Sequence, residues 1–176
     1  GCLDYHYKGQ DHLLQAAVIL RDLNVDFKMH FIGGGNELEN FRKKSELLGL
    51  TRLVKIFGFV PDLELKREFA QASIFAMPSN GEGFGLVYLE AASYGLPTLV
   101  GTSGGAPETI IPGVSGFVVG DKKTIIEGVL YFIENPSELD SFGNKNRENK
   151  NERRKTKHET EKERKRKKEK ERKRKR

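Results

Sequence analysis

The stretch Pro78-Ser-Asn-Gly-Glu-Gly-Phe-Gly-Leu-Val-Tyr-Leu-Glu90 follows the apolar run Ser73 to Met77 and leads into a helical pattern that ends near Tyr94. Its glycines, at positions 81, 83 and 85, allow tight turns and let a ligand approach backbone N–H groups. The start of the helix adds a dipole that favours an anion. The stretch therefore predicts a strand, a phosphate-binding loop and a helix, in that order.

Two carboxylates flank this predicted phosphate site. Glu82 lies in the loop, and Glu90 lies five residues into the helix, roughly 7 Å along its axis at ~1.5 Å per residue. Helical side chains lean toward the N-terminus, so the Glu90 carboxylate can reach a group one sugar ring beyond the phosphates. Ionised carboxylates accept hydrogen bonds from sugar hydroxyls, which favours a sugar phosphate over a bare phosphate. The competing interpretation is a plain strand-to-helix turn with two solvated glutamates, because a glycine-rich loop alone is weak support.

Apolar runs alternate with amphipathic helical patterns on both sides of this stretch. Strands are predicted over residues 27–32, 53–57, 73–77, 98–101 and 116–119, and helices over about 10–23, 36–49, 62 onward, 85–95 and 121–135. Continuous apolar strands between helices are typical of a parallel sheet covered on both faces, so we predict a doubly wound, mostly parallel Rossmann-like α/β domain. Ligands bind such sheets at the carboxyl ends of the strands, where the sequence predicts loops at 33–35, 58–60, 78–85 and 102–107.

The chain of 176 residues divides sharply by composition. Residues 1–143 hold the apolar residues of one core together with 12 basic and 18 acidic residues, whereas residues 144–176 hold no apolar residue, 19 basic residues and 7 acidic ones. The second segment cannot bury enough surface to offset the entropy of ordering, so we expect a low-complexity basic tail that is disordered or a solvated helix and adds nothing to the core. The overall net charge of +6 belongs to this tail, and it does not indicate nucleic acid as a partner of the domain.

Cysteine count, hydropathy and the first residues bear on location and completeness. The single cysteine, Cys2, excludes an internal disulfide, and no stretch approaches the roughly 18 apolar residues that a membrane span requires. We expect a cytoplasmic protein, with the inner membrane surface as an alternative location. Residues Gly1 to Leu3 look like the end of a truncated first strand, whose loss would leave two neighbouring strands with unpaired edges.

Read at full length, Glu82-Gly-Phe-Gly-Leu-Val-Tyr-Leu-Glu90-Ala-Ala-Ser-Tyr-Gly-Leu-Pro97, with Gly104-Gly-Ala-Pro-Glu108 after it, resembles the retaining group 1 (family 4) glycosyltransferases. The resemblance covers nearly all of residues 1–143 and includes Lys8–Asp11, Phe31–Gly35, Ile56–Val60, Pro78–Ser79 and Gly113–Val119. It implies one half of a GT-B fold, the C-terminal nucleotide-sugar-binding domain. It also implies transfer of a sugar from a nucleotide-diphosphate-sugar donor with retention of configuration, to a sugar, lipid-linked or other acceptor bound by a separate N-terminal domain. No metal or other cofactor is implied.

The resemblance assigns roles to single residues. Glu82 contacts the transferred sugar, and Glu90 holds the ribose hydroxyls. Lys8 neutralises the diphosphate, on which negative charge builds as the glycosidic bond breaks; its other interpretation is a solvated surface lysine. The remaining binding positions contribute mainly backbone groups to the diphosphate or the base: Gly35, Phe59, Val60, Gly83, Phe84, Gly85, Leu86 and Val87.

One departure from the family pattern concerns the diphosphate. The family has an arginine six residues before the lysine, where this chain has Cys2. Cysteine supplies neither a permanent cation nor a bidentate fork, so we expect diphosphate stabilisation to fall by about 2 to 4 kcal/mol. The departure supports an alternative in which the chain is a non-catalytic nucleotide-sugar-binding remnant.

Other patterns in the sequence are compatible with other kinds of site. Gly101-Thr-Ser-Gly-Gly105 fits the nucleophile elbow of hydrolases, but the only downstream histidine is His158 in the tail. Neither an Asp-x-Asp pair nor histidine spacing supports a metal site. His6 and His12 flank Lys8 and either line the site or lie in solvent. The tail is either solvated low-complexity sequence or a segment that binds phosphates of an anionic membrane or nucleic acid, and nucleic acid is the less favoured partner.

Overall fold

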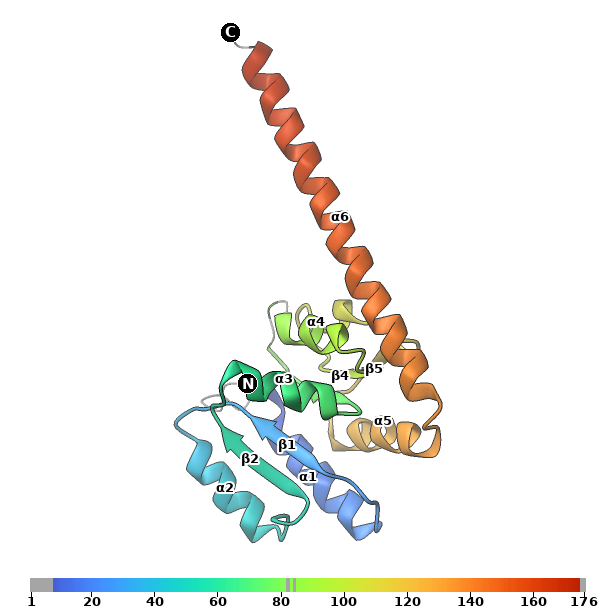
Figure 1. The fold of residues 1–176 in the computed structure, drawn as a ribbon. Coiled ribbons are helices and arrows are strands. Elements are labelled where there is room, and N and C mark those ends of the chain that lie inside the picture. Colours follow the sequence, from blue (N-terminus) through green and yellow to red (C-terminus); the bar gives the residue numbers. More distant parts are fainter. Residues whose placement is uncertain (1–7, 82, 84, 175–176) are drawn as a thin grey trace.

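The computed structural model describes residues 8–81, 83 and 85–174. Within these residues, parallel strands are surrounded by helices, and one long C-terminal helix projects from the domain (Figure 1). The elements are α1 (Gln10–Asp22), β1 (Met29–Ile32), α2 (Leu38–Leu47), β2 (Val54–Gly58), α3 (Asp62–Gln71), β3 (Phe75–Met77), α4 (Leu86–Ser93), β4 (Thr98–Val100), the 3-10 helix η2 (Pro107–Thr109), β5 (Gly116–Val118), α5 (Lys122–Glu134) and α6 (Glu138–Arg174). The predicted alternation of strands and helices is confirmed.

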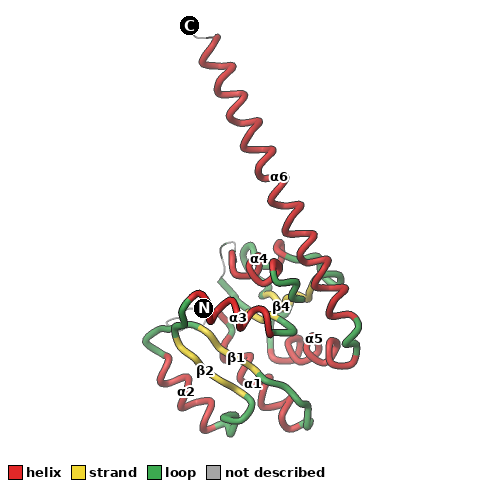
Figure 2. Tube along the Cα trace, in the orientation of Figure 1, coloured by secondary structure: helices red, strands yellow, loops and turns green. Residues whose placement is uncertain are grey.

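The described strands form two parallel sheets. β1 pairs with β2, which lies beside it in Figure 2, and β3, β4 and β5 pair in that order. Every pair is parallel, as predicted from the continuous apolar strands. Among the described residues β4 pairs on both sides, and β1, β2, β3 and β5 each pair on one side only. The strand end expected at residues 1–3 lies outside the described part of the chain.

The main core lies between the sheets and the helices α1 and α5. Leu14, Ala17 and Ile125 are fully buried in it, and α1 packs directly against α5. Gly128 on α5 lies against Leu99 on β4, where an added Cβ would come within 2.9 Å of a Leu99 methyl group. The apolar faces of both helices therefore cover the strands, as expected for an α/β domain.

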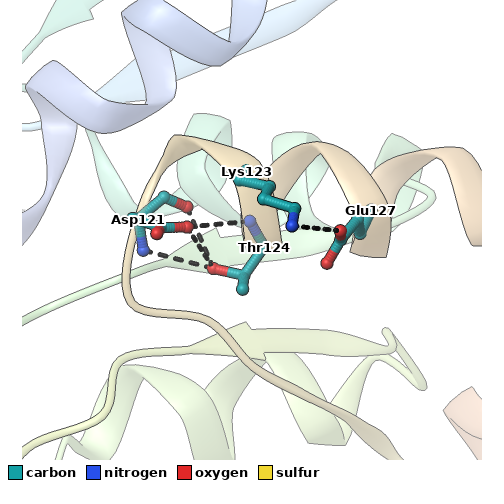
Figure 3. Close-up of polar contacts among 4 residues, drawn as sticks. All are labelled: Asp121, Lys123, Thr124 and Glu127. Carbon is teal, nitrogen blue, oxygen red and sulfur yellow. Dashed lines mark hydrogen bonds and ion pairs between the residues drawn. The ribbon is translucent and has the colours of Figure 1, made fainter.

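Helix α5 begins with a capping box. The carboxylate of Asp121 accepts a hydrogen bond from the Thr124 N–H at 2.9 Å, and the Thr124 hydroxyl accepts one from the Asp121 N–H at 3.2 Å (Figure 3). Hydrogen bonds to an ionised carboxylate stabilise it, so the backbone N–H and the hydroxyl of Thr124 lower the pKa of Asp121. The nearby ion pair of Lys123 and Glu127, at 3.8 Å, is exposed and adds little. The predicted helix start at Asp121 is confirmed.

The first turns of α6 pack against α4, and their polar side chains bond to the chain that follows α4. Asn146 donates hydrogen bonds to the Leu96 carbonyl and the Thr98 hydroxyl, each at 2.7 Å, and Asn149 donates one to the Thr109 carbonyl at 3.1 Å. Both asparagines are buried. The expectation that residues after 143 add nothing to the packed domain is wrong for these turns, because a search for apolar residues passes over asparagine.

Beyond this contact α6 runs into solvent. From residue 154 on, the described side chains are exposed, and the helix extends well past the domain (Figures 1 and 2). Of the two predicted states of the tail, the structure shows the solvated helix rather than a disordered segment.

Candidate functional site

The loop between β3 and α4 lies at the carboxyl end of β3, as predicted. The chain passes through residues 78–85 and enters α4 at Leu86. Gly85, just before the helix, has a φ of 67° and a ψ of 62°, a left-handed conformation that favours glycine. Within the described residues no side chain caps this helix start, so the amides of Leu86 and Val87 are available to an anion.

Tyr88 fixes α4 against the end of β3. Its hydroxyl donates a hydrogen bond to the Met77 carbonyl at 2.7 Å, and its ring meets Phe75 edge to face with centroids 6.0 Å apart. The side chain is 1% exposed. Sequence reasoning gave Tyr88 no role, although a tyrosine inside an apolar run signals a buried hydroxyl that needs a partner. The helix start is thereby held in a fixed position relative to the strand.

A second loop, residues 102–107, lies beside the first. The Gly105 N–H donates to the Gly83 carbonyl at 2.8 Å. Gly101, just after β4, lies so close to Ser79 that an added Cβ would fall 1.8 Å from the Ser79 carbonyl oxygen. The two loops that the sequence predicted at this edge of the sheet are therefore in direct contact.

Lys8 lies near the loop at residues 78–85 because the next residue, Gly9, packs on the start of that loop. Gly9 precedes α1 with a φ of 77°, and a Cβ there would lie 2.3 Å from the Pro78 carbonyl oxygen. The backbone at Gly9 thus packs directly on the residue that begins the loop, and half-buried Lys8 is adjacent to it in the chain. One turn into α1, the buried Nδ1 of His12 makes no hydrogen bond to any described residue.

The carboxyl ends of β1 and β2 carry the other predicted binding residues. The Gly33 N–H donates to the Gly58 carbonyl at 2.8 Å, and a Cβ added at Gly34 would lie 3.8 Å from the Cβ of Phe59. The loop ending at Gly35 and the loop at Phe59 are therefore neighbours, and each follows its strand as predicted. Phe59 is 90% exposed, whereas the side chain of Val60 is buried.

The remaining predicted site residues divide into described and undescribed ones. Glu90 is exposed on α4, and Leu86 and half-buried Val87 form its first turn. Glu82 and Phe84, together with Cys2, lie outside the described residues. The contacts assigned to all of these residues stay predictions.

Residues 8–81, 83 and 85–174 contain no group of three or more His, Cys, Asp or Glu side chains that could hold a metal ion. None of the helices in these ranges is both long and apolar enough to span a bilayer.

The sequence model of one family, described as glycosyl transferases group 1, matches residues 3–149. The chain belongs to the group 1 glycosyltransferases. The matched residues include the loops at 33–35, 58–60, 78–85 and 102–107. They also include the first turns of α6, which pack on α4. The family resemblance noted in the sequence is confirmed.

Curated relatives of this glycosyltransferase chain are longer proteins. It is 36% identical over 149 residues to the GDP-mannose-dependent alpha-(1-6)-phosphatidylinositol monomannoside mannosyltransferase of Mycolicibacterium smegmatis, covering 80% of this chain and 39% of the relative. It is 36% identical over 119 residues to the D-inositol 3-phosphate glycosyltransferase of Corynebacterium jeikeium, covering 64% of this chain and 28% of the relative. The chain therefore spans less than two fifths of the length of these relatives.

Solved structures show the same fold. The Anabaena protein HepE, in complex with UDP, aligns with a TM-score of 0.75 at 24% identity, over 85% of this chain and 42% of HepE. The C-terminal domain of the group 1 protein LpcC from Francisella tularensis aligns with a TM-score of 0.73 at 22% identity, over 85% of this chain and 82% of that domain. The predicted fold class, a Rossmann-like half of a GT-B fold, is confirmed.

Proposed function

We propose that the chain is the donor-binding half of an enzyme that transfers a sugar from a nucleotide-diphosphate-sugar with retention of configuration. The observation that carries the proposal is the uncapped start of α4, which directly follows Gly85 and lies beside the loop that contacts Gly9. Unpaired amides and the helix dipole attract a diphosphate, and the dipole alone contributes about 0.3–1 kcal/mol at exposed sites. Lys8 supplies a cation that offsets the charge developing on the leaving nucleotide.

The rest of the donor follows from the direction of α4. Glu90 lies four residues after Leu86, about 6 Å along the helix axis at ~1.5 Å per residue. A ribose attached to a diphosphate at the helix start reaches this distance, and the exposed Glu90 carboxylate accepts hydrogen bonds from its two hydroxyls. Main-chain groups at Phe59 and Val60 bind the base, and Glu82 contacts the transferred sugar.

GDP-mannose is the first donor to test. The mycobacterial relative, at 36% identity, is named for this donor, whereas HepE was solved with UDP at 24% identity. The name of that relative also includes phosphatidylinositol monomannoside, so we include a lipid-linked acceptor in the proposal, bound by a further domain. No metal takes part in the proposed reaction.

Calorimetric titration of the chain with GDP-mannose, UDP-glucose and ADP-glucose tests donor binding. Lys8→Gln removes the cation that meets the diphosphate, and Glu90→Gln leaves one uncharged acceptor oxygen for the two ribose hydroxyls, so we expect each change to lower affinity roughly tenfold or more. Lys122→Gln and Glu134→Gln, which change exposed residues of α5, are the matched controls and should leave affinity unchanged. Failure of all three donors to bind would overturn the donor-site assignment.

Slow hydrolysis of the bound donor tests the stereochemistry. Proton NMR distinguishes the anomers, so the first sugar released should have the configuration that it had in the donor. Release of the opposite anomer would refute retention. Donor binding without hydrolysis, and without transfer when the rest of the enzyme is supplied, would favour the non-catalytic binding remnant instead.

A further inference from the structure

The loop between β3 and α4 contains Asn80-Gly81, and asparagine is followed by glycine at this one place in the chain. Both residues are exposed and lie outside the helices and strands. The side chain of an asparagine carries an amide carbon that the backbone nitrogen of the next residue can reach, and a bond between them closes a succinimide ring. The pair therefore places an electrophile and a nucleophile together in the loop that leads to the start of α4.

Few contacts restrain this pair. Within the described residues the Asn80 side chain has no hydrogen-bond partner, and the Gly81 N–H donates only to the Ser79 hydroxyl, at 3.4 Å. An N–H···O hydrogen bond normally measures about 2.7–3.2 Å, so this one is weak. Glycine also reaches backbone conformations that other residues avoid, and it has no side chain to hinder the approach. The Gly81 nitrogen is therefore free to turn toward the Asn80 amide.

The other asparagines lack this combination. Asn146 is buried and hydrogen-bonded inside the domain. Asn135 is followed by proline, which has no N–H. Each remaining asparagine precedes a residue whose side chain crowds the following nitrogen and restricts the backbone. Asparagine is one of the residues that heat damages most readily, and in this chain we expect the damage to begin at Asn80.

Contacts on both sides of the pair make the loop sensitive to its own length. Ser79 packs closely on Gly101, and Gly83 is hydrogen-bonded to Gly105, so the second loop holds the chain at both ends of residues 80–82. Hydrolysis of a succinimide gives aspartate or isoaspartate, and isoaspartate inserts a methylene carbon into the backbone. That extra length has to be taken up within this short stretch. Both products also carry a carboxylate, which repels a diphosphate bound nearby.

We propose that Asn80 is a site of spontaneous deamidation, and that deamidation weakens binding of the donor. The Gly81 nitrogen loses its proton to solvent and bonds to the side-chain carbonyl carbon of Asn80. The amide nitrogen of Asn80 takes up a proton and leaves as ammonia, and water then opens the succinimide at either carbonyl. The reaction consumes one water and releases one ammonia, and nothing is oxidised or reduced. The effect on the donor rests on the proposed function, whereas the reaction depends only on the two residues.

Incubation of the full chain in warm, mildly alkaline buffer tests the reaction, because base generates the reactive Gly81 nitrogen. Peptide mapping by mass spectrometry should show aspartate and isoaspartate accumulating at position 80, with release of ammonia. Asn80→Ser should abolish these products, and Gly81→Ala should form them roughly threefold or more slowly. The control Asn151→Ser changes an exposed asparagine of α6 and should leave the rate at position 80 unchanged.

Calorimetry with GDP-mannose measures the consequence of the reaction. We expect the aged chain to bind roughly three- to tenfold more weakly than the fresh chain, because a new negative charge lies near the diphosphate. Asn80→Ser aged in the same way should keep the affinity that it had when fresh. Circular dichroism of the aged chains checks that both are still folded.

The two halves of the proposal have separate refutations. Absence of isoaspartate at position 80, or equal conversion at Asn80 and Asn151, would overturn the assignment of the reactive site. Unchanged affinity after complete conversion would overturn the effect on the donor. The fresh chain separates this test from the proposed function: if it binds no donor, the donor site is refuted, and the products at position 80 still decide the chemistry.

Discussion

Replacing Tyr88 with phenylalanine isolates the contact that holds α4 on β3. The change keeps the ring and its edge-to-face contact with Phe75 and removes the hydroxyl that donates to the Met77 carbonyl at 2.7 Å. The same carbonyl also accepts the Ser79 N–H at 2.8 Å, so it keeps one partner in the variant. The cost is therefore that of one buried hydrogen bond, about 0.5–1.5 kcal/mol, without the larger penalty of an orphaned carbonyl.

Thermal unfolding and calorimetry measure the two consequences of Tyr88→Phe. A domain of this size loses about 2–4 °C in Tm per kcal/mol, so we expect a fall of roughly 1–6 °C. Without this hydrogen bond the start of α4 is less firmly held, and GDP-mannose must fix it in place on binding. That costs about as much free energy as the lost hydrogen bond supplied, so we expect affinity for GDP-mannose to fall about two- to tenfold. Tyr94→Phe is the matched control: Tyr94 ends the same helix, its ring stacks on Phe69, and its hydroxyl has no hydrogen-bond partner among the described residues.

The two measurements refute different steps of the reasoning. If Tyr88→Phe and Tyr94→Phe had the same Tm, the hydrogen bond to Met77 would not stabilise the domain. If the Tm fell while nucleotide affinity stayed constant, the start of α4 would not be the anion site.

Other variants test the remaining contacts. Gly101→Ala places a Cβ 1.8 Å from the Ser79 carbonyl oxygen, so it should destabilise the domain by about 2–3 kcal/mol or more in urea unfolding. In the control Gly83→Ala the added Cβ meets no atom within 4 Å, so the free energy of unfolding should stay the same. Asn146→Ala removes two buried hydrogen bonds and should cost about 2–3 kcal/mol. Asn149→Ala removes one buried hydrogen bond and a longer, part-buried one from Arg153, and it should cost less, about 1–2 kcal/mol. Asp121→Ala should lower the Tm at neutral pH. Because the Asp121 pKa is lower in the folded state, its contribution is present above the ordinary aspartate pKa of about 4 and disappears as the pH falls through the folded pKa. Tm values of the two proteins should therefore converge in acid.

Much of the fold was predictable because it depends on local periodicity. Each predicted strand contains the observed one or differs from it by a residue, as in β2, which extends to Gly58. The meeting of the loops at Gly35 and Phe59, and of those at Gly83 and Gly105, follows from parallel topology, which brings all carboxyl ends to one edge. The motifs could therefore be placed near one another without coordinates.

Contacts between specific polar groups could not be derived in the same way. The partner of the Tyr88 hydroxyl depends on how far α4 lies from β3, which no sequence spacing gives. Asn146 and Asn149 were assigned to a solvated tail because they are polar, yet their spacing from Phe142 places all three on one helix face. A helix face that carries one aromatic side chain and two amide side chains indicates a buried face. A hydropathy profile misses it because the amides are polar.

The hydrogen bond between Asn146 and Thr98 gives β4 a mechanical role. Thr98 begins the strand at the base of α6, and Gly101, just past its end, touches Ser79 in the loop that leads to α4. The strand between them is three residues long, so roughly 10 Å of chain at about 3.3 Å per residue joins the two contacts. β4 is completely buried and paired on both sides, so it cannot stretch or bend easily. A force applied to the far end of α6 would thus reach the loop at Ser79 through one short, stiff element.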